Sequence, residues 1–483
     1  MTNLNLWFDP SKCLIGGEWV PPASGRTLPL EDPSTGNQIG NIARGGAEDI
    51  NAALAAARNA FEGSWGRVSA AERGRILLKL RDLVLEKVED LARIEALDVG
   101  KPLKQARADA VALARYCEFY GGAADKLHGE TIPYLDGYTV YTLREPHGVT
   151  GHIVPWNYPM QIIGRSVGAA LATGNACVLK PAEDACLTAL AFADLARQAG
   201  VPDGALNVVP GLGAEAGAAL CASPDVDHIS FTGSVATGVQ VQMAAARNVT
   251  PVTLELGGKS PQVVFEDADL DAALPFLVNA GIQNAGQTCS ASSRILVHRS
   301  VHDEVLARMA ARYSALRVGP ALADLDVGPL ISRKQLGIVS SFLEQGADLE
   351  TAARGLLSDV PSNGNYVQPT LFAGVRPDHA LARDEIFGPV QVVITFDDEE
   401  EAIAIANGTE YGLVASVWTR DGARQMRMAK RIRTGQVFIN NYGAGGGVEL
   451  PFGGRGKSGH GREKGFEAMY GFTCLKTVAA YHG

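Results

Sequence analysis

Residues 149–180 read VTGHIVPWNYPMQIIGRSVGAALATGNACVLK, with an apolar run at each end of a segment of helical length. Further apolar runs follow at 206–209 and 228–231, and they are again separated by stretches such as 184–199 that are long enough for a helix. Short apolar strands that alternate with helical segments are typical of a parallel sheet, since each crossover needs about a dozen residues. The sequence therefore predicts an α/β fold in this part of the chain.

Helical patterns precede this sheet, and a second α/β segment follows Glu255 and runs to about residue 455. A capping box of Ser69 and Glu72 predicts the start of a long helix that continues through Leu91 and ends at the Gly-Lys-Pro sequence of 100–102. An earlier helix is predicted from four apolar residues that share one face at helical spacing: Ile50, Leu54, Ala57 and Phe61.

Length and composition exclude several classes of protein. The 483 residues exceed what one hydrophobic core usually holds, so two or three domains are expected. The net charge of −10 comes from interspersed acids and bases without a basic stripe, which argues against nucleic acid or an anionic membrane as partner. The N-terminal residues lack the pattern of an export signal, and no stretch is as long as a membrane-spanning helix. We therefore expect a protein that acts on small molecules.

The chain has seven cysteines, scattered without the spacing of a disulfide framework or a zinc site, which predicts a reducing cytoplasm and no bound metal. Cys289 is distinctive because it lies downstream of a glycine-flanked carboxylate in Glu255-Leu256-Gly257-Gly258. A cysteine attacks a carbonyl carbon as thiolate and needs a base or a cation nearby. Cys289 and Glu255 are therefore candidates for a nucleophile and its base, although a buried cysteine is more often a small apolar filler.

Two segments of the predicted sheet suit a dinucleotide. The strand at 176–179 leads into Lys180 and Glu183 at the carboxyl edge of a parallel sheet, where α/β folds bind ligands, and the carboxylate can bond ribose hydroxyls. The strand at 228–231 leads into the turn 232–238, whose glycines allow backbone and a helix N-terminus to approach phosphate. A plain strand-to-helix turn is the alternative, because the Gly-x-Gly-x-x-Gly fingerprint is absent.

Seven motifs appear in the order found in the aldehyde dehydrogenase superfamily, and jointly they are highly specific. They are Pro155-Trp156-Asn157-Tyr158-Pro159, Lys180-Pro181-Ala182-Glu183, Phe231-Thr232-Gly233-Ser234, Glu255-Leu256-Gly257-Gly258-Lys259, Gly286-Gln287-Thr288-Cys289, Glu385-Ile386-Phe387-Gly388-Pro389 and Pro451-Phe452-Gly453-Gly454. The chain resembles that superfamily from about Leu14 to Val478.

The resemblance implies an architecture of three parts. They are an NAD-binding parallel-sheet domain at 1–128 and 149–255, an α/β catalytic domain at 256–455, and a small β oligomerisation hairpin at 129–148 and 473–483. Exchange of the terminal strand between subunits would then explain a homodimer or a homotetramer.

The resemblance also implies the chemistry, which is NAD-dependent oxidation of an aldehyde to a carboxylic acid. Cys289 would attack the aldehyde, and the Asn157 amide with the Cys289 N–H would stabilise the oxyanion. After hydride transfer to the nicotinamide, Glu255 would deprotonate the water that hydrolyses the thioester. Glu463 matches a glutamate that several relatives place in a proton relay with this base, but the lysine that often partners it is Ser166 here. A surface charge is the alternative for Glu463.

Nine residues match the cofactor site of the superfamily. They are Trp156 and Lys180 on the adenosine side, Glu183 at the ribose, Gly233, Ser234 and Gly238 in the pyrophosphate turn, Glu385 at the nicotinamide ribose, Phe387 packed on the nicotinamide, and Leu256, which completes the set. Glu183 would repel a 2′-phosphate, so NAD is favoured and NADP is possible.

Three residues are assigned to the substrate: Arg165, Tyr158 and Gln283. Arg165 stands where semialdehyde and some aromatic-aldehyde dehydrogenases carry arginine, and a guanidinium can pair bidentately with a carboxylate. Gln283 replaces the second arginine of the semialdehyde enzymes, which weakens the case for a short dicarboxylic semialdehyde. The glycine-rich run 443–447 replaces bulky tunnel residues, so a wide entrance is expected unless the run is only a flexible loop. The predicted substrate is a bulky or aromatic aldehyde, or a semialdehyde.

Three other functions stay open. A CoA-acylating semialdehyde dehydrogenase would release the thioester to CoA, but such relatives generally lack the glutamate seen here as Glu255. A structural, crystallin-like protein would tolerate loss of Cys289 or Asn157, and both are present. A cysteine hydrolase would use the same thiol and base without a cofactor, which would leave the nucleotide-site motifs without a purpose.

Overall fold

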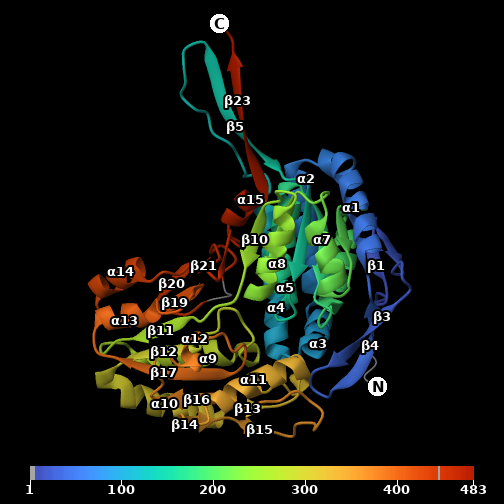
Figure 1. Cartoon of the computed structure of the whole chain (residues 1–483). Coiled ribbons are helices and arrows are strands. Elements are labelled where there is room, and N and C mark those ends of the chain that lie inside the picture. The colour runs from blue at the N-terminus through green and yellow to red at the C-terminus, as the bar shows by residue number, and fades with distance from the viewer. Residues whose placement is uncertain (1–5, 444–446) are drawn as a thin grey trace.

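The computed structural model describes residues 6–443 and 447–483 of the chain. Two large sheets with their helices lie side by side, and a long two-stranded hairpin extends away from both (Figure 1). Residues 444–446 of the glycine-rich run lie outside the described residues. No helix in the described ranges is long and apolar enough to cross a membrane.

The first sheet has the strand order β2-β1-β8-β7-β6-β9-β10-β22. The strands are β1 (Cys13–Ile15), β2 (Glu18–Val20), β6 (Val149–Val154), β7 (Ala176–Pro181), β8 (Leu206–Val208), β9 (His228–Thr232), β10 (Val252–Glu255) and β22 (Gly459–His460). The strands from β8 to β10 run parallel, whereas β1 and β22 pair antiparallel at the two sides. The four apolar strands predicted from the sequence are therefore confirmed, with ends that agree within two residues.

The helices of this part agree with the sequence patterns except at one bend. They are α1 (Ala47–Glu62), α2 (Ala70–Glu86), α3 (Val88–Val99), α4 (Leu103–Ala123), α5 (Pro159–Thr173), α6 (Leu187–Ala199), α7 (Ala218–Ala222) and α8 (Val235–Ala246). The capping box is confirmed, since Ser69 Oγ accepts the Glu72 N–H at 3.3 Å and the Glu72 carboxylate accepts the Ser69 N–H at 3.0 Å. The single helix predicted through Leu91 is wrong, because Lys87 leaves helical geometry with ψ of 14° and the bend lets α2 and α3 both pack on α4.

The second sheet has the order β14-β16-β17-β12-β11-β19-β20. Its strands are β11 (Pro261–Val264), β12 (Arg294–His298), β14 (Glu350–Arg354), β16 (Thr370–Ala373), β17 (Val390–Phe396), β19 (Val414–Trp418) and β20 (Gln436–Ile439). Its helices are α9 (Leu270–Ile282), α10 (His302–Ala315), α11 (Arg333–Gln345), α12 (Ala380–Arg383), α13 (Glu399–Ala406) and α14 (Gly422–Arg431). The chain then returns to the first sheet at β22, so the domain boundaries drawn from the resemblance stay a prediction.

The hairpin that extends from the molecule consists of β5 (Tyr138–Pro146) and β23 (Thr473–Tyr481). The two strands pair antiparallel within one chain along their whole length, from Thr473 opposite Pro146 to Tyr481 opposite Tyr138. Within this chain β5 supplies the ladder partner of β23, and the expected exchange of the terminal strand between subunits stays a prediction. The short helix α15 (Glu467–Gly471) leads into this hairpin.

The carboxyl ends of the parallel strands bring the predicted site residues to one edge of the first sheet. Asn157 follows β6, Lys180 lies in β7, and Glu255 ends β10. In the register of β9 with β10, Thr232 lies opposite Glu255. Cys289 approaches from the other half of the molecule, in the connection between α9 and β12. The edge of one sheet and a loop of the other therefore have to meet for the predicted chemistry.

Buried Asn175 joins this sheet to the base of the hairpin. Its Nδ2 donates to the carbonyl of Phe472 at 2.9 Å, and its Oδ1 accepts the Gly148 N–H at 3.0 Å. Its backbone carbonyl accepts the indole N–H of Trp65 at 2.9 Å. One side chain therefore satisfies backbone groups of two segments that are distant in the sequence.

Replacing Asn175 with Ala leaves the Phe472 carbonyl and the Gly148 N–H without their partner in a buried place. We expect a loss of about 2–3 kcal/mol of stability, since each buried unpaired group costs about 1–3 kcal/mol. The midpoint of denaturant unfolding would show it, with exposed Asn51→Ala in α1 as the matched control. Equal midpoints for the two variants would contradict the joining role of Asn175.

Candidate active site

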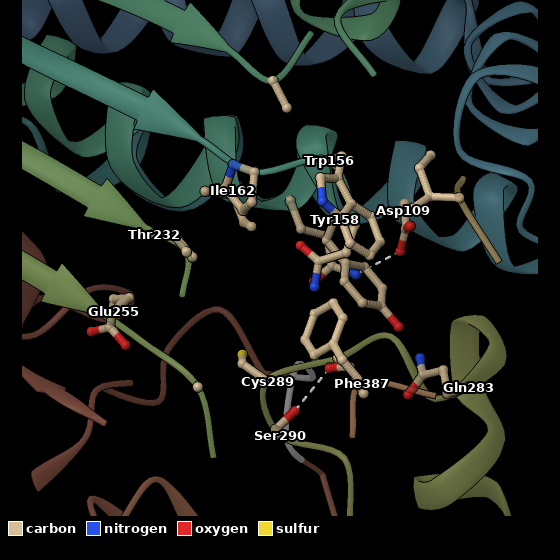
Figure 2. Close-up of a pocket in the computed structure, with 18 of the residues that line it drawn as sticks. Asp109, Trp156, Tyr158, Ile162, Thr232, Glu255, Gln283, Cys289, Ser290 and Phe387 are labelled. Carbon is tan, nitrogen blue, oxygen red and sulfur yellow. Dashed lines mark hydrogen bonds between the residues drawn. The ribbon is translucent and has the colours of Figure 1, made fainter. Parts of the chain in front are cut away.

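A cavity of about 1360 Å³ lies where the edge of the first sheet meets the second half of the molecule. It is lined by α4, by α5, by the carboxyl ends of β6, β7 and β9, and by the segment around Cys289. Figure 2 shows Cys289 and Glu255 at one end of this space, with the rings of Trp156, Tyr158 and Phe387 farther along it. Thirteen of the predicted residues line it: Trp156, Asn157, Tyr158, Arg165, Lys180, Glu183, Gly233, Ser234, Glu255, Gln283, Cys289, Glu385 and Phe387.

Cys289 reaches the cavity through a left-handed turn. Asn284, Ala285 and Gly286 have φ values of 49°, 54° and 72°, and a Cβ at Gly286 would stand 2.1 Å from the Gly388 carbonyl oxygen. Only glycine fits that place, because any side chain would strike backbone. Burial raises the pKa of the Cys289 thiol to about 12, although the positive charge of Arg165 opposes the shift. The thiol therefore needs proton removal when it attacks a carbonyl group.

Glu255 ends β10 with its side chain 1 % exposed. Burial raises its pKa well above the usual range, Arg165 opposes this shift, and the negative charge of Glu463 adds to it. No described residue donates a hydrogen bond to either carboxylate oxygen. Gly453 allows the close approach of the next segment, since a Cβ there would lie 2.8 Å from Glu255 Oε1. A buried carboxylate of raised pKa is a strong base for a water molecule in the cavity.

Asn157 is held by the segment that carries the thiol. Its Nδ2 donates to the Gln287 carbonyl at 3.0 Å, and its own backbone carbonyl accepts from Asn284 Nδ2 at 2.9 Å. An amide nitrogen carries two N–H groups, so one of them is left for a ligand oxygen. These bonds fix Asn157 and the turn before Cys289 relative to each other.

The far part of the cavity is a cleft at the ends of β7 and β9. Lys180 Nζ contacts Glu183 Oε2 at 2.8 Å, so a cation and a carboxylate stand together at the sheet edge. Ser234 caps α8, with its Oγ accepting the Thr237 N–H at 3.3 Å. A Cβ at Gly233 would stand 2.6 Å from the Phe231 ring, so the backbone here lies close to the sheet. The first turn of α8 therefore offers N–H groups to an anion.

Glu385 and Phe387 come from the second half and close this cleft. The Gly258 N–H donates to Glu385 Oε1 at 3.0 Å, and burial raises the pKa of Glu385 to about 7. Phe387 has a left-handed φ of 55°, and its ring meets that of Trp156 edge to face at 5.3 Å between centroids. A non-glycine residue in that conformation is strained, and such strain often marks a functional segment.

Comparison with known proteins agrees with this geometry. The model of the family described as "Aldehyde dehydrogenase family" matches residues 19–478. The chain belongs to the aldehyde dehydrogenase family. The superfamily resemblance inferred from the seven motifs is thereby confirmed.

Three relatives show how far the similarity of this family member extends. The mitochondrial benzaldehyde dehydrogenase of Antirrhinum majus is 44% identical over 97% of this chain and 88% of its own length. A crystal structure from Burkholderia cenocepacia that bears the family name is 64% identical, with a TM-score of 0.97 over 98% of this chain and 100% of the other. An NAD+ complex of aldehyde dehydrogenase from Bacillus cereus is 40% identical, with a TM-score of 0.95 over 98% and 97% of the two chains. The cytoplasmic location stays a prediction.

Three predicted residues lie outside the cavity lining. Gly238 and Leu256 contact each other behind it, since a Cβ at Gly238 would stand 2.6 Å from the Leu256 side chain, and they pack α8 onto the sheet. Glu463 is fully buried and forms an ion pair with Arg165, so the alternative of a surface charge is wrong.

Sequence reasoning missed several residues beside the predicted ones. Asp109 lines the cavity and belongs to a buried cluster in which Lys101 Nζ contacts Glu95 at 2.7 Å and also contacts Asp109. Lys101 Nζ also lies 4.1 Å from the ring centroid of Tyr158. In the sequence, Lys101 stands in the Gly-Lys-Pro segment, which indicated only the end of a helix. Lys464 lines the cavity as well, and burial lowers its pKa to about 8. Only its place next to Glu463 could have drawn attention to it.

Proposed function

We propose that this protein oxidises an aldehyde to a carboxylic acid with NAD, through a thiohemiacetal and a thioester on Cys289. The observation that carries the proposal is the cavity that the Cys289 thiol and the Glu255 carboxylate share (Figure 2). A nucleophile, a base of raised pKa and an adjoining anion-binding helix end are what oxidation followed by hydrolysis requires. The family membership supports the same reaction class.

The residues of the cleft fit NAD. The first turn of α8 at Ser234 suits a pyrophosphate, and the Glu183 carboxylate at the edge of β7 suits ribose hydroxyls. The same carboxylate would repel a 2′-phosphate, which supports NAD over NADP. The relative from Bacillus cereus is described as an NAD+ complex. When bound, the nicotinamide accepts the hydride that leaves the thiohemiacetal carbon.

The protein residues supply the remaining steps. The Cys289 sulfur forms the bond to the aldehyde carbon as the thiol gives up its proton to solvent, and the spare Asn157 N–H and the Cys289 backbone N–H donate to the oxygen that becomes negative. After the hydride has left, Glu255 takes a proton from the water that attacks the thioester. The C–S bond then breaks, the carboxylic acid leaves, and Glu255 returns the proton to the sulfur, which restores the thiol.

Glu255→Gln removes the base and keeps the shape, so thioester hydrolysis should slow by about 100-fold or more while hydride transfer continues. Rapid mixing with NAD and an aldehyde would then show a retained burst of NADH followed by slow turnover. Cys289→Ala should lose both phases and still bind NAD, and exposed Glu18→Gln serves as the control. Loss of the burst in Glu255→Gln would mean that this carboxylate acts before hydride transfer.

Bulky or aromatic neutral aldehydes are the substrate class that we propose. The Arg165 guanidinium is ion-paired with Glu463 and also donates to Thr232 Oγ1 at 3.0 Å, so it is already engaged. Gln283, which lines the cavity, offers no charge. The Antirrhinum majus relative is named for benzaldehyde, which agrees with a neutral aromatic substrate. A semialdehyde would need a cation for its carboxylate, and Lys464, which lines the cavity with a pKa lowered by burial to about 8, is a weaker partner than a free guanidinium.

Initial rates of NADH formation with paired aldehydes test this class. We expect kcat/KM for benzaldehyde to exceed that for succinate semialdehyde by about tenfold or more, because a buried carboxylate without a partner is costly. Each aldehyde is offered with NAD and with NADP, and NAD should be preferred. Preference for the semialdehyde would overturn the neutral class and return Arg165 to the role of an anion clamp.

We further propose that the hairpin joins subunits into a homodimer or homotetramer. Large apolar side chains are exposed on the hairpin and on the segment just before β5, and exposed apolar patches mark interfaces. They include Tyr134 at 65%, Leu135 at 63%, Leu475 at 56% and Tyr481 at 70% exposure.

Light scattering should therefore give two or four times the chain mass of 50.8 kDa. The double variant Tyr134→Asp/Leu475→Asp should give a smaller assembly, since charges in an apolar interface are costly. Leu85→Asp, an equally apolar exposed position on α2, should leave the mass unchanged. A parent protein that is monomeric throughout would refute the joining role.

A further inference from the structure

Arg165 and Glu463 form a buried ion pair beside the base. Arg165 on α5 places Nε against Glu463 Oε2, and both side chains are almost entirely buried. Glu463 Oε1 accepts the Ser230 hydroxyl at 2.6 Å, and the Arg165 guanidinium lies 5.2 Å from the ring centroid of Phe452. The backbones of Phe452 and Glu463 exchange two hydrogen bonds, of 2.7 and 2.8 Å. The pair is thus fixed on both sides.

The anchors of the pair belong to β9, the strand next to Glu255. Arg165 Nη2 donates to Thr232 Oγ1 at 3.0 Å, and Thr232 lies opposite Glu255 in the parallel register. Ser230, which binds Glu463, is the next residue of β9 on the same face. On the other side, Gly453 follows Phe452 and brings the backbone close to Glu255 Oε1. The pair therefore holds the walls between which the Glu255 carboxylate lies.

The type of cation matters for proton transfer. A lysine can release a proton to a neighbour, whereas arginine stays charged at any ordinary pH. Ser166, at the place where relatives often carry the lysine, turns its hydroxyl to the Ile162 carbonyl of its own helix at 2.8 Å. Among the described ion pairs, the cation that contacts Glu463 is Arg165, which cannot pass a proton on.

We propose that Arg165 and Glu463 form a fixed ion pair that positions the Glu255 carboxylate, with Arg165 acting neither as a clamp for a substrate carboxylate nor as a link in a proton relay. The inference rests on the proposed function, because Glu255 acts as base only if the thioester is hydrolysed. Both residues are positioning residues, since they act through Glu255.

The charges around Glu255 predict the direction in which loss of either partner shifts the pKa of Glu255. Arg165, Arg462 and Lys464 lower the pKa of Glu255, Glu463 raises it, and the Cys289 thiol shares its surroundings. Hydrolysis needs the ionised carboxylate, so its rate falls as pH falls through that pKa. Loss of Arg165 should move this acidic limb to higher pH. Loss of the Glu463 charge should move it to lower pH.

The test is the pH profile of kcat for NADH formation from about pH 5 to pH 10, measured on the full-length protein. Arg165→Met should shift the acidic limb upward by about one pH unit, because a unit charge within contact range moves a pKa by about 1–3 units. Glu463→Gln should shift it downward, the double variant should return toward the parent, and Arg165→Lys should rescue most of the upward shift. A residue that only supports the fold would not produce shifts of opposite sign.

Two outcomes would overturn the inference. The first is an unshifted limb in Glu463→Gln and in Arg165→Met. The second is a selective rise of KM for ω-carboxylated aldehydes in Arg165→Met, which would show a clamp. If Arg165→Met does not fold, the pH profiles of Glu463→Gln and Arg165→Lys still test the direction in which the acidic limb moves.

Alkylation of Cys289 by iodoacetamide, without aldehyde or NAD, separates this inference from the proposed function. Arg165 lowers the pKa of the Cys289 thiol, so Arg165→Met should slow alkylation at fixed pH by about threefold or more, with Cys289→Ala as the blank. An unchanged alkylation rate would count against a fixed positive charge of Arg165 near the Cys289 thiol. A parent that forms no NADH with any aldehyde would instead refute the proposed function and leave this measurement valid.

Discussion

The parallel register of β6, β9 and β10 is the constraint on which the site depends. It brings Asn157, Thr232 and Glu255 to one sheet edge, because parallel strands end on the same side. Cys289 is not part of that sheet and reaches it from the connection before β12. The left-handed turn that ends at Gly286 and the hydrogen bonds of Asn157 with Asn284 and Gln287 hold the Cys289 segment at the sheet edge.

Several charged side chains are buried at this edge, and their burial costs stability. Glu255, Arg165 and Glu463 are each less than one-tenth exposed. Removing charges from water is unfavourable unless partners and hydrogen bonds compensate. Arg165 and Glu463 compensate each other, whereas neither carboxylate oxygen of Glu255 has a hydrogen-bond partner among the described residues. Of these three side chains, Glu255 is therefore the one whose burial no ion pair offsets, and this burial raises its pKa.

Local patterns predicted much of the fold, and most of the site residues predicted from the motifs line the cavity. The apolar strands, the Ser69 capping box and the motifs around Cys289 and Glu255 are all expressed within a few adjacent residues, and the structure keeps them together. The break at Lys87 could not be predicted, because the two helices separate to pack on α4 rather than by any local stop signal.

Pairings between distant segments were equally hidden. Arg165 with Glu463 and Lys101 with the ring of Tyr158 each join residues whose neighbours in sequence carry no trace of the contact. Motif matching assigned Arg165 by its position in the chain, whereas its physical environment depends on what the tertiary fold places against it. Residue type and order predict which groups are present, and packing decides which of them are already engaged.

The return of the chain to β22 has a mechanical consequence. The polypeptide crosses between the two halves once after Glu255 and once before Gly459, and the two crossings lie together, since Ser458 Oγ donates to the Gly257 carbonyl at 2.7 Å and Glu255 pairs with Gly459. The two crossings therefore lie on either side of the end of β10, and they anchor the backbone of Glu255 to both halves of the molecule at once.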